Sequence, residues 1–121
     1  MKERKKIIWI GSSKKDLLAL SKEVQGMLGY GLNLAQQGLR DTDTKILKGF
    51  GGGSVIEIIK SDPCGTYRAV YSIRFEDVIY VLHIFQKKSK AGIATPKTDI
   101  DLIKNRLKDA LKIHRELYES S

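Results

Sequence analysis

The period of apolar and polar positions changes several times along the chain, and each change predicts an element boundary. Lys6 to Ile10 is a short β-branched and aromatic run, which predicts a first strand. Lys14 to Leu20 predicts a short helix, with Ser13 as its capping residue. A second helix is expected between Ser21 and Gly38, because serine favours a helix start and glycine a helix end.

Three glycines, Gly26, Gly29 and Gly31, interrupt the apolar spacing of that second helix. Each costs a helix about 1 kcal/mol relative to alanine. We therefore expect the helix to pack tightly against a sheet at these three positions.

The second half of the chain predicts three strands and a long helix. Asp41 to Gly53 is a polar connector. The strands are expected at Ser54–Lys60, Thr66–Ile73 and Val78–Phe85, with turns at 61–65 and 75–77. After Thr95-Pro96, apolar residues recur at the spacing of an amphipathic C-terminal helix. The order β-α-α-β-β-β-α predicts one α+β domain over residues 1–121, with consecutive strands paired as a meander.

Composition narrows the class of protein. The chain has 121 residues, which suits one domain, and its 22 Lys and Arg against 14 Asp and Glu give a net charge of +8. This charge favours nucleic acid, an anionic membrane or an acidic protein as partner, without choosing among them. A single cysteine excludes an internal disulfide. The apolar run at 7–10 is too short for a signal peptide or a membrane span, so we expect a cytoplasmic protein.

Three features of the sequence could indicate a phosphate-binding loop, a reactive thiol or a metal site, but each has a simpler interpretation. The glycine run at 49–53 leads into a strand, whereas a phosphate-binding loop opens a helix, so it predicts a connector. Cys64 has no activating base beside it and predicts an incidental thiol. His83 and His114 are far apart in sequence and match no zinc spacing, so we expect no metal and no cofactor.

Arg68 and Arg74 occupy alternate positions along one strand, so both point to the same face, along with Val70 and Ser72. Arginine binds phosphate through a planar fork of donors. For Arg74, near the turn, a solvated strand face is the favoured interpretation. For Arg68, in the middle of the strand, a structural and a functional role both stay open.

The end of the last strand carries a second group of candidates. His83 is either a structural histidine or a proton-transfer group. Lys87 and Lys88 follow it at the strand end, where they could flank a phosphate, and Phe85 could stack on a base. If Glu76 and Asp77 form a two-residue loop, Arg68 lies opposite Phe85 and shares a face with His83.

The C-terminal helix carries a run of basic residues, for which two interpretations stay open. They form either a solvated face or a surface that docks an acidic partner or steers RNA. They are Lys97, Lys104, Arg106, Lys108, Lys112 and Arg115.

These segments resemble a known superfamily. KGFGGGSVIEI at 48–58, YRAVYSIRFEDVIYVLHIFQKKSK at 67–90 and TPKTDIDLIKNRL at 95–107 are similar to RelE/ParE toxins of bacterial toxin–antitoxin pairs, and most similar to the phage-derived, HigB-like branch. The resemblance implies an α+β fold with two helices packed on an antiparallel-rich sheet and a long C-terminal helix. It also implies a toxin that cuts messenger RNA, commonly on the ribosome, and that a cognate antitoxin of the helix-turn-helix type neutralises.

The resemblance assigns roles to residues at matching positions. Arg68 matches a strand arginine that contacts the RNA phosphate, and Lys87 and Lys88 match a basic pair that closes the final strand. Further substrate contacts are implied at Lys48, Phe85 and Gln86. ParE-like members instead inhibit DNA gyrase without cutting RNA, and a plain RNA-binding module is a third possibility.

The mechanism expected from these residues is metal-independent attack of a ribose 2′-hydroxyl on the adjacent phosphate. Arg68 and Lys88 would stabilise the developing negative charge, and His83 would act as acid or base. On this hypothesis, replacing Arg68 by alanine abolishes cleavage and leaves the protein folded.

Overall fold

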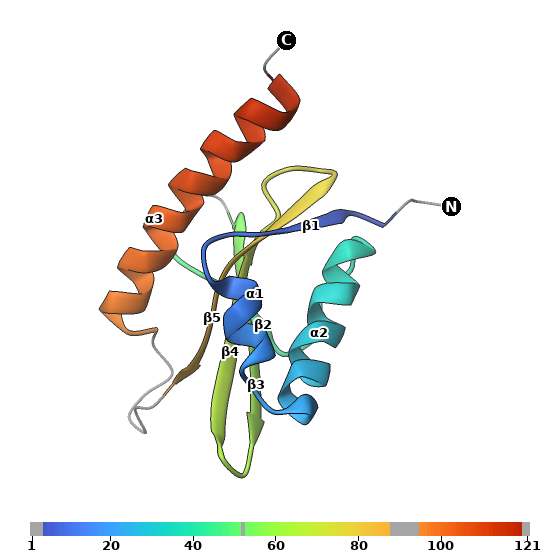
Figure 1. The fold of residues 1–121 in the computed structure, drawn as a ribbon, viewed down its shortest axis with the longest axis vertical. Helices are drawn as coiled ribbons and strands as arrows, with labels where there is room; N and C mark the ends of the chain where they lie inside the picture. The colour runs from blue at the N-terminus through green and yellow to red at the C-terminus, as the bar shows by residue number, and fades with distance from the viewer. Residues whose placement is uncertain (1–3, 52, 88–94, 120–121) are drawn as a thin grey trace.

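The computed structural model describes residues 4–51, 53–87 and 95–119 (Figure 1). Within these ranges the chain forms five strands and three α-helices, followed by a short π-helical turn. In chain order they are β1 (Lys6–Trp9), α1 (Ser13–Leu18), α2 (Lys22–Gln36), β2 (Thr44–Ile46), β3 (Val55–Asp62), β4 (Gly65–Ser72), β5 (Val78–Lys87), α3 (Lys97–His114) and the turn Arg115–Glu119.

The five strands form one sheet in the order β1-β5-β4-β3-β2. The neighbours from β2 to β5 pair antiparallel, as the predicted meander requires, and β1 pairs parallel with β5. The α+β class and the long C-terminal helix are therefore confirmed. The element order contains one strand more than predicted, because β2 lies inside the segment expected to be a connector. Its three residues are too few to show an alternating pattern, and pairing with β3 makes them a strand.

Helices cover both faces of the sheet, with α1 and α2 on one side and α3 on the other (Figure 1). One core lies between α2 and the sheet and includes Leu28, Ile58 and Tyr71. A second core lies under α3 and includes Tyr80, Leu82 and Ile103. Alternate residues of the central strands therefore serve two different cores.

The ends of α2 follow the predicted signals. The Ser21 side chain accepts a hydrogen bond from the Val24 N–H. Gly38 has a φ of 79° and, with Leu39, closes the helix by bonding carbonyls of its last turn. The predicted cap of α1 was wrong: Ser13 lies inside the helix and its buried hydroxyl donates to the Val81 carbonyl.

A β-bulge interrupts the pairing of β4 with β5. Val70 pairs with His83, but the next residue, Tyr71, pairs with Val81, so Leu82 is an extra residue in β5. Leu82 packs in the core under α3, and His83 also faces that helix. The bulge thus shifts the alternation of β5 by one residue from His83 onward.

Arg106 attaches α3 to the sheet. It therefore does not belong to a solvated face of the helix, which was one of the two interpretations of the basic run. Its guanidinium donates to the Leu82 carbonyl and to the Ser12 hydroxyl, both at 3.0 Å. The other basic residues of the C-terminal run are exposed. None of the helices in the described part of the chain is long and apolar enough to cross a membrane.

The three glycines of α2 differ in their surroundings. A Cβ at Gly31 would lie 2.8 Å from the Cδ1 of the fully buried Ile58, which confirms tight packing at this position. A Cβ at Gly26 or Gly29 would meet nothing within 4 Å, so the prediction was wrong for these two.

One substitution should therefore have opposite effects at two neighbouring positions. Gly29→Ala should raise the free energy of unfolding by about 0.5–1 kcal/mol, because alanine favours the helix and meets no neighbour. Gly31→Ala should lower it, because overpacking against Ile58 costs about 1–3 kcal/mol. Urea unfolding of both variants measures the difference, and equal effects would contradict the packing described for Gly31.

Candidate functional site

A buried ion pair lies on the face of the sheet that α3 covers. Arg68 Nη1 on β4 is 2.8 Å from Glu57 Oε1 on β3. The two residues are 2% and 0% exposed. Removing two charges from water is unfavourable unless they are well paired, so each of these groups requires the other.

Glu57 has two further partners. Lys45 Nζ on β2 is 3.4 Å from Oε1, and the Thr95 hydroxyl, just before α3, donates to Oε2 at 3.0 Å. One carboxylate therefore connects three strands with the start of α3. Sequence reasoning missed all three residues, although a single acidic residue in the apolar run VIEII was a usable signal for Glu57.

Lys87, the last residue of β5, adds a third cation to this face. Its burial and the nearby charges of Arg68 and Lys45 lower the pKa of Lys87, which Glu57 partly offsets. A lysine with a lowered pKa loses its positive charge at a lower pH than usual. It can therefore give up a proton more readily than an exposed lysine.

His83 forms a pair with Asp99 in the first turn of α3. The distance from His83 Nε2 to Asp99 Oδ1 is 2.8 Å. The ring stacks on Phe85, with centroids 4.5 Å apart. Nδ1 is buried, and no residue in the described ranges forms a hydrogen bond with it. Asp99 was not predicted as a partner of His83, because no sequence pattern indicates that a residue of this helix contacts a residue of the strand.

The predicted register at the site is confirmed. Arg68 pairs with Phe85, and His83 lies on the same face. The expected cause was wrong, because residues 73–77 connect the strands in place of a two-residue loop. The bulge at Leu82 compensates for the longer connection and restores the register at Arg68.

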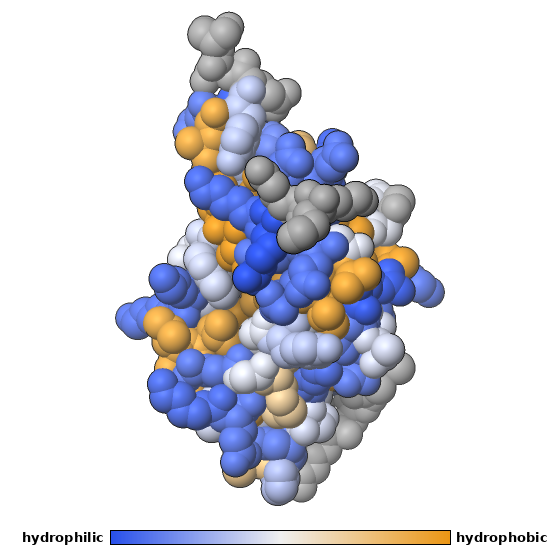
Figure 2. Space-filling model, turned by 90° about the vertical axis from the view of Figure 1, so that its right-hand side faces the viewer, coloured by the Kyte–Doolittle hydropathy of each residue, from blue (hydrophilic) through white to orange (hydrophobic). Residues whose placement is uncertain are grey.

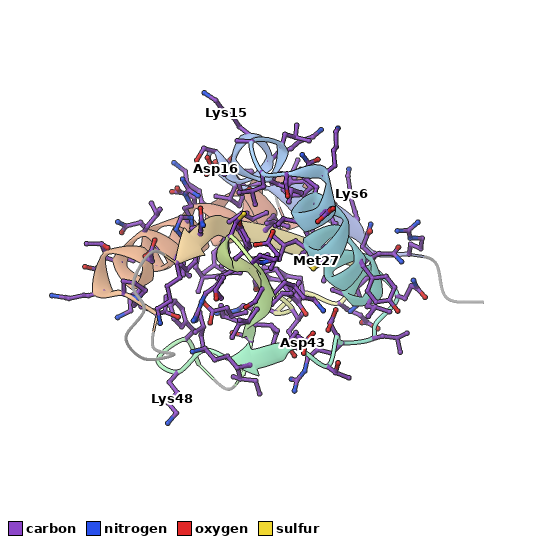
Figure 3. All side chains as sticks on the ribbon, turned by 90° about the horizontal axis from the view of Figure 1, so that it is seen from below. Lys6, Lys15, Asp16, Met27, Asp43 and Lys48 are labelled. Carbon is purple, nitrogen blue, oxygen red and sulfur yellow. The ribbon has the colours of Figure 1, made fainter. Side chains whose placement is uncertain are left out.

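Three other candidates lie away from the cluster, and a fourth lies outside the described residues. Lys48 is exposed on the loop after β2 and points away from the body of the protein (Figure 3). Gln86 faces the other side of the sheet and donates to the Cys64 carbonyl. Arg74 lies beyond the end of β4 and is exposed. Lys88 lies outside the described residues.

Metal and thiol chemistry have little basis in the described ranges. No three His, Cys, Asp or Glu side chains there lie close enough together to hold a metal ion. Cys64 is exposed in the turn between β3 and β4.

Nucleic-acid contact is common among small α+β proteins that carry basic residues around one face of a sheet. The family model "Phage derived protein Gp49-like (DUF891)" matches residues 15–108. The chain therefore belongs to the Gp49-like family, a RelE-like family of toxin–antitoxin systems. Its members are commonly the toxin of such a module, which implies a cognate antitoxin as partner. No curated protein matches the chain.

The buried pair predicts strong coupling in a double-mutant cycle. Glu57→Gln or Arg68→Gln alone should lower the free energy of unfolding by about 3–5 kcal/mol, because each removes the main partner of a buried charge. The double variant should lose much less than the sum. Asp43→Asn, which removes the exposed partner of Lys60, serves as control and should cost at most about 1 kcal/mol.

Chemical denaturation of these variants measures the cycle, and additive losses would contradict it. The expectation that Arg68→Ala leaves the protein folded is therefore not supported by the geometry, because Glu57 would remain buried without its main partner.

Proposed function

We propose that this protein is a HigB-like toxin that cuts messenger RNA on the ribosome and thereby stops growth. The observation that carries the proposal is the convergence of Arg68, Lys45 and Lys87 on one sheet face beside the His83–Asp99 pair. Concentrated positive charge next to a histidine is suited to phosphodiester cleavage.

In the proposed reaction the ribose 2′-oxygen attacks the adjacent phosphorus while its proton passes to a base. The bond from phosphorus to the 5′-oxygen breaks, and that oxygen receives a proton from an acid. The products are a 2′,3′-cyclic phosphate and a 5′-hydroxyl end. Arg68 stabilises the charge on the phosphorus-bound oxygens, with Lys88 in the same role by resemblance.

The hydrogen bonds of the site support an assignment of acid and base. If His83 Nε2 carries the proton that Asp99 accepts, Nδ1 holds a lone pair and can act as base. Lys87 is suited to the acid, because its pKa is lowered. Phe85 is half-buried beside His83 and would stack on a base of the RNA.

Substrate access requires a local change. Arg68, Glu57 and His83 are nearly covered, and the Thr95–Glu57 bond holds the start of α3 against them. A hydrogen bond to a charged group contributes about 1.5–3 kcal/mol, so bound RNA could displace it. A guanidinium has five N–H donors and can therefore bind a carboxylate and a phosphate together.

The same burial favours a second candidate, a ParE-like toxin that inhibits DNA gyrase without cutting RNA. A structural cluster under α3 needs no contact with substrate. A supercoiling assay with purified gyrase, run beside sequencing of transcript ends in a translation extract, separates the two activities. Salt-dependent RNA binding without cleavage would instead indicate a binding module.

Lys87→Met should lower messenger cleavage by about 100-fold or more, because the group proposed to protonate the leaving 5′-oxygen is lost. Lys104→Met removes the same charge from the exposed side of α3 and should leave cleavage within about twofold. Primer extension on a reporter transcript measures both rates, and equal rates would remove Lys87 from the mechanism.

His83→Gln should lower the cleavage rate by about 100-fold or more, because glutamine cannot accept the proton of the 2′-hydroxyl. Asp99→Asn keeps a hydrogen-bonding group beside the ring and should lower the rate without abolishing cleavage. Single-turnover cleavage measures both variants. An unchanged rate in His83→Gln would mean that the histidine is structural.

A further inference from the structure

A groove on the α2 side of the molecule is not used by the proposed chemistry. It has a volume of about 200 Å³ and lies between the end of α2, the segment that follows it and the end of β4. The residues that define it here are Lys5, Leu39, Arg40, Tyr71 and Ile73. On the side of the molecule that Figure 2 shows, hydrophobic surface forms small islands among hydrophilic residues.

Two apolar side chains that line this groove are largely exposed to solvent. Leu39 is 57% exposed and Ile73 is 40% exposed. The Leu39 N–H bonds the Leu34 carbonyl and the Gly38 N–H bonds the Ala35 carbonyl, which is the pattern of a Schellman helix end. In this motif a residue at the position of Leu39 usually packs back onto its helix. Here most of its surface stays open.

The two charged residues that line the groove are both positive. Lys5 and Arg40 line it, and no carboxylate does. Asp41 is adjacent in sequence, but Lys60 holds its carboxylate at 3.0 Å. A second copy of this chain would bring the same cations to the groove and be repelled, whereas an acidic segment would be attracted.

The floor of the groove carries no negative charge. Burial raises the pKa of Tyr71 to about 12; the Arg40 guanidinium opposes this shift and the nearby charge of Asp41 adds to it, both to a smaller extent. The hydroxyl therefore stays protonated at neutral pH. An apolar floor with cations on its rim fits an apolar side chain flanked by carboxylates better than it fits a nucleic-acid backbone.

The groove and the candidate site lie on opposite faces of the sheet. Tyr71 packs in the core with α2, whereas Arg68 lies on the face that α3 covers. A partner in the groove would therefore leave the α3 face uncovered. We propose that this groove binds an apolar anchor on an acidic segment of the cognate antitoxin. The proposal rests on membership of the toxin family and is independent of the nuclease chemistry.

The test uses two matched double variants of the full chain. Leu39→Asp with Arg40→Glu alters the groove, and Leu18→Asp with Lys15→Glu makes equivalent changes on exposed residues of α1. The antitoxin encoded by the adjacent gene is the probe, and calorimetry gives its affinity. The groove variant should bind at least about 100-fold more weakly than the wild type, and the α1 variant within about threefold.

Growth assays separate this proposal from the proposed function. Without antitoxin the groove variant should arrest growth like the wild type, and co-expressed antitoxin should relieve the arrest in the α1 variant only. If RNA cleavage is wrong, the binding result is unaffected. Antitoxin binding by the groove variant within threefold of wild type would overturn the proposal. The proposal would also be overturned if the groove variant still bound the antitoxin but lost RNA binding or self-association.

Hydrogen exchange on the wild type provides a test that does not depend on the variants folding. Antitoxin should protect backbone amides around Leu39 and Ile73 in the groove, and leave those around Leu18 unchanged. Protection confined to other segments would also overturn the proposal.

Discussion

The buried charge of Glu57 is the constraint on which the rest of the α3 side depends. A carboxylate without solvent contact must be paired, and its partners come from β2, from β4 and from the segment that begins α3. The strands and the helix are therefore held in one arrangement by a polar interaction as well as by their apolar contacts. The same requirement concentrates arginine and lysine where a phosphate could bind.

The bulge at Leu82 determines which residues join this cluster. Without the extra residue, the alternation set at Val78 and Tyr80 would place His83 and Phe85 on the α2 side. With it, both face α3, and Asp99 can reach the imidazole. Asp99 and Arg106 also fix the position of α3 itself, since Arg106 bonds the carbonyl of the bulged residue. Helix position and site geometry are thus set by the same few residues of β5.

Sequence patterns predicted those parts of the fold that depend on neighbouring residues. Ser21 and Gly38 mark the ends of α2, and strong alternation marks β4 and β5. The short strand β2 depends on a partner distant in the chain and was not predicted. Arg68 was found as a candidate because it interrupts an apolar strand, which is a local pattern. Lys45, Thr95 and Asp99 were not found. Their roles depend on a tertiary arrangement that no local pattern encodes.

The parallel pairing of β1 with β5 has a consequence for biosynthesis. Lys6 pairs with Val78, so roughly 70 residues must leave the ribosome after the first strand before that strand has its partner. At about 5–20 residues per second this takes about 4–14 s. During that interval the sheet is incomplete and neither core is closed. The complete sheet can therefore form only after synthesis has passed β5.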